Sequence, residues 1–346
     1  MKKIRILAAL FLCACIVCVS LSGCASTLWA MKTNKITVPT GVYLYYLLNE
    51  RSAIQSGDLG DSSITSSGTS SDPWSNKIDK KNAADWAAQK AQKETRELLA
   101  TEALCAEKKI TLTSDEKSTV SSQADNMIST YPIFNSNGIA KSSLERVLAY
   151  NTYLKDKLFQ SYYGTNGSKA VSDNDLKNYY TNHFVQVKQI FFNIKDDSGN
   201  ALTSAQQSDK EKKAKDIMGQ VSSDRSNFDS LMNANTEDPG VKEYPSGYIF
   251  GQSESYVKEF KNAAFAMKVG DVRLVKSSLG YHVLYKVQLD ACQFDSKKSD
   301  VLTDMKNSEF LKMLDNYKGI SVNNSTIGRY KPQKLVTDES SSEATT

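Results

Sequence analysis

The chain has 346 residues, with 43 Lys and Arg against 39 Asp and Glu, and only two His. Three of the basic residues lie in the first 23 positions, which leaves 40 basic and 39 acidic residues in the remainder. A nucleic-acid-binding protein would carry a basic excess, so the charge argues against that class. Two histidines and no cluster of metal-ligand spacing argue against a zinc site, and we predict no metal and no cofactor.

The N-terminus has the pattern of an export signal. Basic residues at positions 2, 3 and 5 precede an apolar run from Ile6 to Val19, which is shorter than the ~20 residues that span a bilayer. Leu21-Ser22-Gly23-Cys24 follows and resembles a bacterial lipobox. We therefore predict a signal peptide over 1–23 and lipidation of Cys24, which would anchor the chain to the extracytoplasmic face of the cell membrane. An ordinary secretory signal followed by a chance cysteine is the alternative.

Two cysteines remain beyond the signal and Cys24. Cys105 and Cys292 lie far apart in the sequence. Outside the cell they could form one disulfide, or they could be two separate thiols. The sequence leaves both possibilities open.

Residues 24–184 are predicted to form a helical lobe. Apolar spacing indicates helices over about 36–54, 83–108 and 144–162. Residues 56–75 are rich in Ser, Gly and Asp, which is typical of a flexible loop. Thr113 and Glu116 have the spacing of a capping box that opens another helix.

The pattern changes at Val185, where short apolar strands begin to alternate with helices. Strands are expected over 187–194, 248–250, 272–276 and 282–287, and helices over 205–221, 228–232 and 260–267. The predicted order is therefore β-α-α-β-α-β-β.

Two motifs in this region are specific. They are Phe260-x-x-Ala263-Ala264-Phe265-Ala266-Met267-x-x-Gly270-Asp271 and Gly280-Tyr281-His282-Val283. In order and spacing they resemble the C-terminal half of a parvulin-type peptidyl-prolyl isomerase domain. The resemblance implies a domain over 185–290 with a four-stranded antiparallel sheet flanked by helices, and it implies catalysis without a cofactor.

A last helix is expected near 299–317, with an apolar side that needs a partner. The layout is similar to that of extracytoplasmic foldases of the PrsA and SurA type. That resemblance implies an α+β fold, in which an all-helical chaperone-like lobe carries an inserted parvulin domain and residues 291–330 pack on the N-terminal lobe. Residues 331–346, rich in Ser, Thr and Glu, are expected to be disordered.

The resemblance also assigns site residues. His282 matches the histidine of the last strand, and Asp238 matches the acidic or cysteine position. Substrate-binding positions fall on Phe260, Tyr256 and Phe250. An X-Pro bond isomerises over a barrier of ~18–20 kcal/mol, which such a site lowers by gripping the proline ring and stabilising the twisted amide.

The chain departs from the family at two places. Gln189 stands where the first strand usually has a histidine, and Pro245-Ser246-Gly247-Tyr248 replaces a Gly-Asp-Leu-Gly loop. Glutamine donates and accepts hydrogen bonds but does not titrate near neutral pH. Strand alternation predicts that Gln189 faces His282 across adjacent strands, with Asp238 and Phe260 at the mouth of the same groove.

Two functions follow from these residues. The first is an isomerase that acts on newly exported or unfolded polypeptides with X-Pro bonds. The second is a chaperone or peptide-binding lipoprotein whose parvulin domain is weakly catalytic or inactive, an alternative that Gln189 favours. The client proteins, the oligomeric state and the activity with Gln189 are open at this stage.

Overall fold

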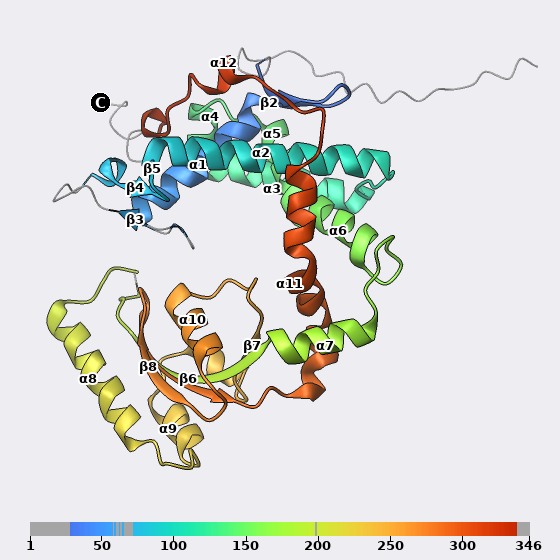
Figure 1. The fold of residues 1–346 in the computed structure, drawn as a ribbon. Helices are drawn as coiled ribbons and strands as arrows, with labels where there is room; N and C mark the ends of the chain where they lie inside the picture. The colour runs from blue at the N-terminus through green and yellow to red at the C-terminus, as the bar shows by residue number, and fades with distance from the viewer. Residues whose placement is uncertain are drawn as a thin grey trace, which may run out of the picture.

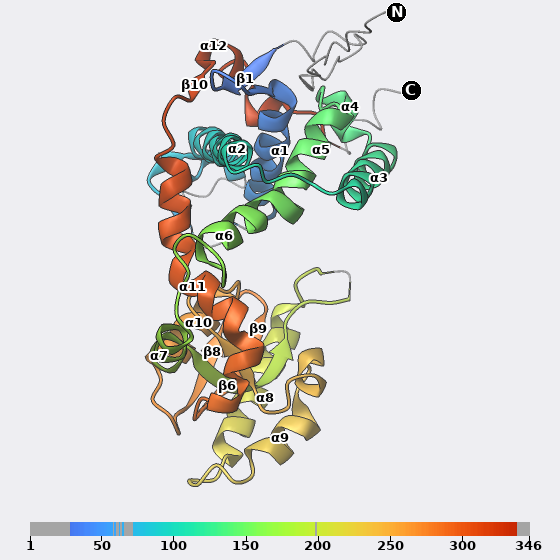
Figure 2. The ribbon, with the colours of Figure 1, turned by 90° about the vertical axis from the view of Figure 1, so that its right-hand side faces the viewer.

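The computed structural model describes residues 28–57, 59, 62, 64–65, 72–197 and 199–337. The predicted signal peptide and Cys24 lie outside these residues. None of the helices within the described part is long and apolar enough to cross a membrane. Figures 1 and 2 show a mainly helical lobe and a sheet domain, with the long helix α11 (Phe294–Asp315) running from one to the other.

The lobe is built around two long helices. Helix α1 (Thr40–Ser56) packs against α2 (Ala83–Glu107), and a single core of buried apolar side chains joins them. The predicted capping box opens α3 (Ser114–Thr130), since Thr113 and Glu116 cap each other's backbone N–H groups. The remaining helices are α4 (Ile133–Ser136), α5 (Lys141–Ala149) and α6 (Lys155–Tyr163), with one π-helical segment, Tyr150–Leu154, joining α5 to α6.

The lobe also contains strands, so the expectation of an all-helical lobe is corrected in this respect. One antiparallel sheet has the order β10-β1-β2 and a second the order β3-β4-β5. Their bounds are Trp29–Lys32 (β1), Thr37–Pro39 (β2), Ile64–Thr65 (β3), Lys77–Ile78 (β4), Lys81–Asn82 (β5) and Ser321–Val322 (β10). Strands of two to four residues give too little alternation to be recognised in a sequence. Strand β3 falls within the predicted flexible loop, part of which lies outside the described residues.

The sheet domain follows helix α7 (Asp173–His183) and has the predicted element order. Its four strands are antiparallel in the order β7-β6-β9-β8. The strands are β6 (Val185–Asn193), β7 (Tyr248–Phe250), β8 (Val272–Lys276) and β9 (Gly280–Val287), and the helices are α8 (Ser204–Gln220), α9 (Phe228–Asn235) and α10 (Lys258–Ala266). The α+β fold class and the four-stranded antiparallel sheet are therefore confirmed.

Alternating residues of β6 serve two different cores, as the period of two requires. Ile190 and Phe192 pack with side chains of α8 and α9 on one face of the sheet. Val185 and Val187 pack with α10 on the other face. Gln189 belongs by its position to this second face, beside α10.

Helix α11 bridges the two parts of the molecule. A fourth core joins it to α2 and α6 at one end and to α7 and β7 at the other. Phe310 of α11 is 1% exposed, and its ring lies 5.3 Å from that of Phe159 in α6. Arg96 of α2 donates hydrogen bonds to the carbonyl oxygens of Asp315 and Tyr317, at 3.1 and 2.8 Å.

The chain after the short helix α12 (Asn324–Ile327) is ordered further than expected. Pro332 and Leu335 are buried, and Arg51 donates a hydrogen bond of 2.5 Å to the carbonyl oxygen of Pro332. The expected disordered tail therefore does not begin at residue 331, because residues 331–337 are described and apolar side chains there cover the lobe. Residues 338–346 lie outside the described part. Cys105 is buried and Cys292 is exposed, and both are free thiols.

Candidate active site

The register of β6 against β9 brings Gln189 and His282 together. Phe191 lies opposite His282 and Gln189 opposite Leu284, so Gln189 and His282 are diagonal neighbours on one face. The Gln189 amide lies between two polar groups: its Nε2 is 2.6 Å from Oδ2 of Asp238, and its Oε1 is 2.8 Å from Nδ1 of His282. A carboxylate can only accept, so the Gln189 Nε2 donates to it. Gln189 Oε1 then accepts from a protonated Nδ1 of His282.

The other nitrogen of His282 completes the chain of hydrogen bonds. Nε2 lies 2.7 Å from the hydroxyl of Ser277, which must donate if Nδ1 carries the proton. The backbone N–H of Leu279 donates to the same hydroxyl oxygen at 3.1 Å and holds it in place. His282 is 4% exposed, and this burial lowers its pKa from 6.5 to about 4. The imidazole is therefore neutral near neutral pH, in one tautomer.

Asp238 is held at the start of a 3-10 helix, Pro239–Lys242. Its Oδ1 accepts the backbone N–H of Gly240 at 2.9 Å, while Oδ2 accepts from Gln189 and from the Tyr248 hydroxyl at 2.7 Å. The hydroxyl oxygen of Thr236 accepts the N–H groups of Asp238 and Phe191, which ties this turn to β6. Three donors thus satisfy the carboxylate.

An aromatic wall stands beside this network. The Phe260 ring of α10 is 2% exposed and lies 5.6 Å from the His282 ring. Tyr256 stacks on Phe260 at 5.3 Å, and Phe250 lies 4.3 Å from Tyr256. Tyr256 is half-buried, whereas Phe250 and Phe260 are buried. The arrangement places an apolar surface against a fixed row of hydrogen-bonding groups.

The structure thus gathers all six predicted residues of this domain at one place. Sequence reasoning missed three others: Tyr248, Ser277 and Phe191, whose ring lies 4.7 Å from that of His282. Alternation along β6 could have found Phe191, because it shares a face with Gln189. Ser277 lies in a turn and carries no periodic signal. Within the described residues no group of three or more His, Cys, Asp or Glu could hold a metal ion.

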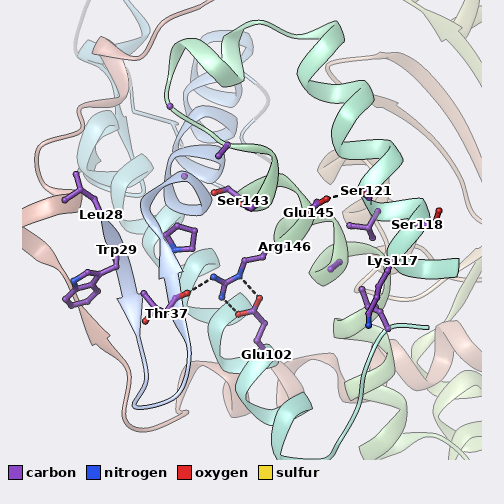
Figure 3. Close-up of a pocket in the computed structure, with 18 residues that line it drawn as sticks. Leu28, Trp29, Thr37, Glu102, Lys117, Ser118, Ser121, Ser143, Glu145 and Arg146 are labelled. Atoms are coloured by element: carbon purple, nitrogen blue, oxygen red, sulfur yellow. Dashed lines mark hydrogen bonds and ion pairs between the residues drawn. The ribbon is translucent and has the colours of Figure 1, made fainter. Parts of the chain in front are cut away.

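A second candidate site is a cavity of about 880 Å³ in the helical lobe, shown in Figure 3. It lies between the β1–β2 hairpin, α3 and α5, and the described residues that line it all belong to the lobe. Arg146 crosses one wall, where it pairs with Glu102 and donates to the carbonyl oxygen of Thr37 at 2.6 Å (Figure 3). Apolar side chains such as Leu28 and Trp29 line the cavity together with small residues and the charged Lys117 and Glu145.

Comparison with known proteins identifies the sheet domain. Residues 174–288 match the family model described as the PPIC-type PPIase domain. This part of the chain is similar to that family. The match covers the whole hydrogen-bonded network described above, from Gln189 to His282, as well as helix α7 except for its first residue, Asp173.

Relatives with similar sequences carry corresponding names. A putative peptidyl-prolyl cis-trans isomerase Cbf2 of Campylobacter jejuni is 33% identical over 131 residues, which cover 35% of this chain and 48% of that protein. Foldase protein PrsA of Staphylococcus aureus is 33% identical over 148 residues, covering 37% and 45%. The chain spans about half the length, or less, of the curated relatives it matches.

Among solved structures, foldase protein PrsA from Streptococcus pneumoniae aligns with 76% of this chain and 91% of its own, at 15% identity and a TM-score of 0.35. PrsA from Bacillus subtilis aligns with 80% and 92%, at 18% identity and a TM-score of 0.26.

Proposed function

We propose that this protein is a peptidyl-prolyl cis-trans isomerase of the parvulin type that assists the folding of exported polypeptides. The observation that carries the proposal is the unbroken row of hydrogen bonds from Ser277 through His282 and Gln189 to Asp238, next to the Phe260 ring. Gln189 occupies the position of the family's first histidine and keeps this row intact.

The catalytic step requires no bond to be broken. The proline ring packs against Tyr256, which the buried rings of Phe260 and Phe250 support from behind, while the amide that precedes the proline twists beside the polar row. Polar groups already fixed in place stabilise the twisted amide without having to reorganise. Lowering the barrier by ~4 kcal/mol would speed isomerisation about a thousandfold. In this role His282 and Asp238 are the two fixed ends of the network. Gln189 joins them, because its Oε1 accepts from His282 and its Nε2 donates to Asp238.

Exchange NMR on a short X-Pro peptide tests the proposal. The mature chain, residues 24–346, is expected to accelerate cis-trans exchange at substoichiometric concentration. Asp238→Ala should reduce this acceleration at least tenfold because it removes the acceptor of Gln189 and Tyr248. Asp229→Ala is the matched control, since Asp229 is an exposed carboxylate that pairs with Lys188. Absence of acceleration by the unmodified chain would refute the isomerase proposal.

Lipid anchoring on the extracytoplasmic face is part of the same proposal. Its support is the apolar run followed by Leu21-Ser22-Gly23-Cys24. Cys24→Ala should release the protein into the medium or leave an uncleaved precursor, as fractionation and mass spectrometry would show. A cleaved variant that stays on the membrane would refute the anchor while leaving the isomerase proposal untouched.

We also propose that residues 24–184 and 291–330 form one chaperone-like lobe around the isomerase domain at 185–290. The core that joins α2 and α6 to α11 supports this division. The alternative function, a foldase-like chaperone that holds polypeptides and hardly isomerises them, is favoured by the cavity in Figure 3, which could take apolar side chains of an unfolded chain. Under either function, we propose that the partners are unfolded or newly exported polypeptides.

Filling this cavity separates the two functions. Ser118→Trp places a large ring in the lining of the cavity, whereas Gln123→Trp adds the same ring to α3 outside that lining. If the lobe binds unfolded polypeptides in this cavity, the Ser118→Trp variant should prevent their aggregation less well than the unmodified protein, and the Gln123→Trp variant should prevent it equally well. Light scattering measures the aggregation. Both variants should keep the isomerase rate, because the cavity lies in the lobe.

A further inference from the structure

Tyr248 is placed where it can contact both the polar row and the substrate. It is the first residue of β7, pairs with Val187 of β6, and stands at the position of the last glycine in the family's loop. Its hydroxyl donates to Asp238 Oδ2 at 2.7 Å. Burial and the neighbouring Asp238 raise the pKa of Tyr248, so the hydroxyl stays a donor. The hydrogen bond to Asp238 therefore fixes the orientation of the Tyr248 ring. The glycine that the family has at this position would offer no ring to the substrate.

The Tyr248 ring continues the aromatic wall outward. Tyr244, Tyr248 and Tyr256, here called the tyrosine ladder, follow one another with ring centroids 5.3 and 6.2 Å apart, and Tyr256 stacks on Phe260 at 5.3 Å. Exposure rises along this path, from 2% at Phe260 to 44% at Tyr244. A proline that rests on Phe260 would leave its neighbouring residue next to the ladder.

Several carboxylates lie beside the ladder. Asp238 accepts from Tyr248, and the neighbouring Glu243 raises the pKa of Tyr244. Burial and then the charge of Glu254 raise the pKa of Tyr256. The nearby Lys297 forms an ion pair with Asp300 at 2.9 Å. An acidic side chain at this place would meet like charges, whereas an aromatic ring would gain edge-to-face or stacked contacts.

We propose that Tyr248 is a specificity-determining residue: with Tyr244 and Tyr256 it binds an aromatic side chain adjacent to the substrate proline. The inference rests on the proposed isomerase function and names the substrate class of that site. The ladder could receive the residue before or after the proline, and the experiment separates these two arrangements. One aromatic contact of this kind corresponds to about three- to tenfold in affinity.

The test uses the mature chain and labelled peptides with the cores Phe-Pro-Ala, Ala-Pro-Phe, Ala-Pro-Ala and Glu-Pro-Ala. Binding is measured by fluorescence polarisation, and turnover of the same peptides by exchange NMR. One of the Phe peptides should bind about three- to tenfold more tightly than Ala-Pro-Ala, and Glu-Pro-Ala should bind most weakly. Tyr248→Ala should abolish this preference, Tyr248→Phe should keep it, and Tyr131→Ala, at an exposed tyrosine of the lobe, should leave it unchanged.

The two readouts distinguish the outcomes. Equal affinity for all four peptides, or a preference that survives Tyr248→Ala in a folded variant, would overturn the inference even if turnover is observed. A preference that depends on the Tyr248 ring in a protein without turnover would support the ladder and overturn the isomerase proposal. Circular dichroism of each variant shows whether it is folded, and Tyr248→Phe repeats the test with the ring retained.

Discussion

The helical lobe and the sheet domain are stabilised in different ways, although α11 contributes to both. The lobe is built on long helices whose apolar sides meet in extended cores, and it places carboxylates such as Glu94 and Glu50 within them. The sheet domain has two small cores, one on each side of four strands, and a buried neutral histidine. Stability in the lobe therefore depends on the apolar contacts between its helices. In the sheet domain the same small cores must both stabilise the fold and position a polar site.

The largest effect is expected at the junction of α6 and α11. Phe310→Ala removes a ring that is 1% exposed and should destabilise the lobe by about 3–5 kcal/mol. The control is Ser308→Ala, at an exposed position of the same helix. Tryptophan fluorescence during urea unfolding measures the effect in the lobe, because Trp29, Trp74 and Trp86 all lie there. If Phe310→Ala lowered the free energy of unfolding of the lobe no more than Ser308→Ala does, α11 would not be a structural part of the lobe.

Lowering the pH should weaken the sheet domain through His282. Its pKa is about 4 in the folded domain, against an ordinary value of 6.5 in the unfolded chain, so between these pH values the unfolded chain binds the proton first. Stability should therefore fall as the pH drops from 6.5 to 4, by about 3 kcal/mol in total. Hydrogen exchange of the β6 and β9 amides should report this loss. His282→Gln should reduce the slope, and His183→Gln, at an exposed histidine, should not.

Phe260 and Phe228 allow a comparison of the two faces of the sheet. Both rings are buried, Phe260 beside the network and Phe228 in the core under α8 and α9. Each change to alanine should destabilise the domain, but Phe260→Ala should also weaken prolyl-peptide binding by ~0.5–1.5 kcal/mol, because it removes the ring on which the half-buried Tyr256 stacks. Titration at a temperature where both variants are folded measures the difference. Equal binding by the two variants would remove Phe260 from the substrate site.

The smallest effect is expected at Glu94, a carboxyl group of the lobe that is only half-buried, because solvent partly screens its charge. Burial, and then the charge of Glu50, raise the pKa of Glu94 from 4.5 to about 7. Between these values the folded lobe keeps a proton that the unfolded chain has released, so stability should fall as the pH rises, opposite in sign to His282. Glu94→Gln should flatten this dependence in the tryptophan signal, with Glu107→Gln as the exposed control. An unchanged slope would place Glu94 in a more solvated setting.

How much the sequence could predict differs between the same two regions. In the sheet domain the family resemblance of the Gly280-Tyr281-His282 motif and the alternation around Gln189 predicted that Gln189 and His282 share a face of adjacent strands, which the register of β6 against β9 confirms. The contacts of Tyr248 and Ser277 could not be predicted, since they come from a loop and a turn whose paths depend on tertiary packing. In the lobe, periodicity found the helices. It missed strands such as β1, whose partner β10 is about 290 residues away in the chain.

The most direct test of the central claim replaces Gln189. The Gln189 amide joins Asp238 to His282, so a side chain that can hydrogen-bond is required there, but not one that titrates. In exchange NMR with an X-Pro peptide, Gln189→His should equal or exceed the unmodified protein. Gln189→Leu, which has a similar size and no hydrogen-bonding group, should lose at least tenfold, about 1.4 kcal/mol. A folded Gln189→Leu variant with undiminished activity would contradict the account.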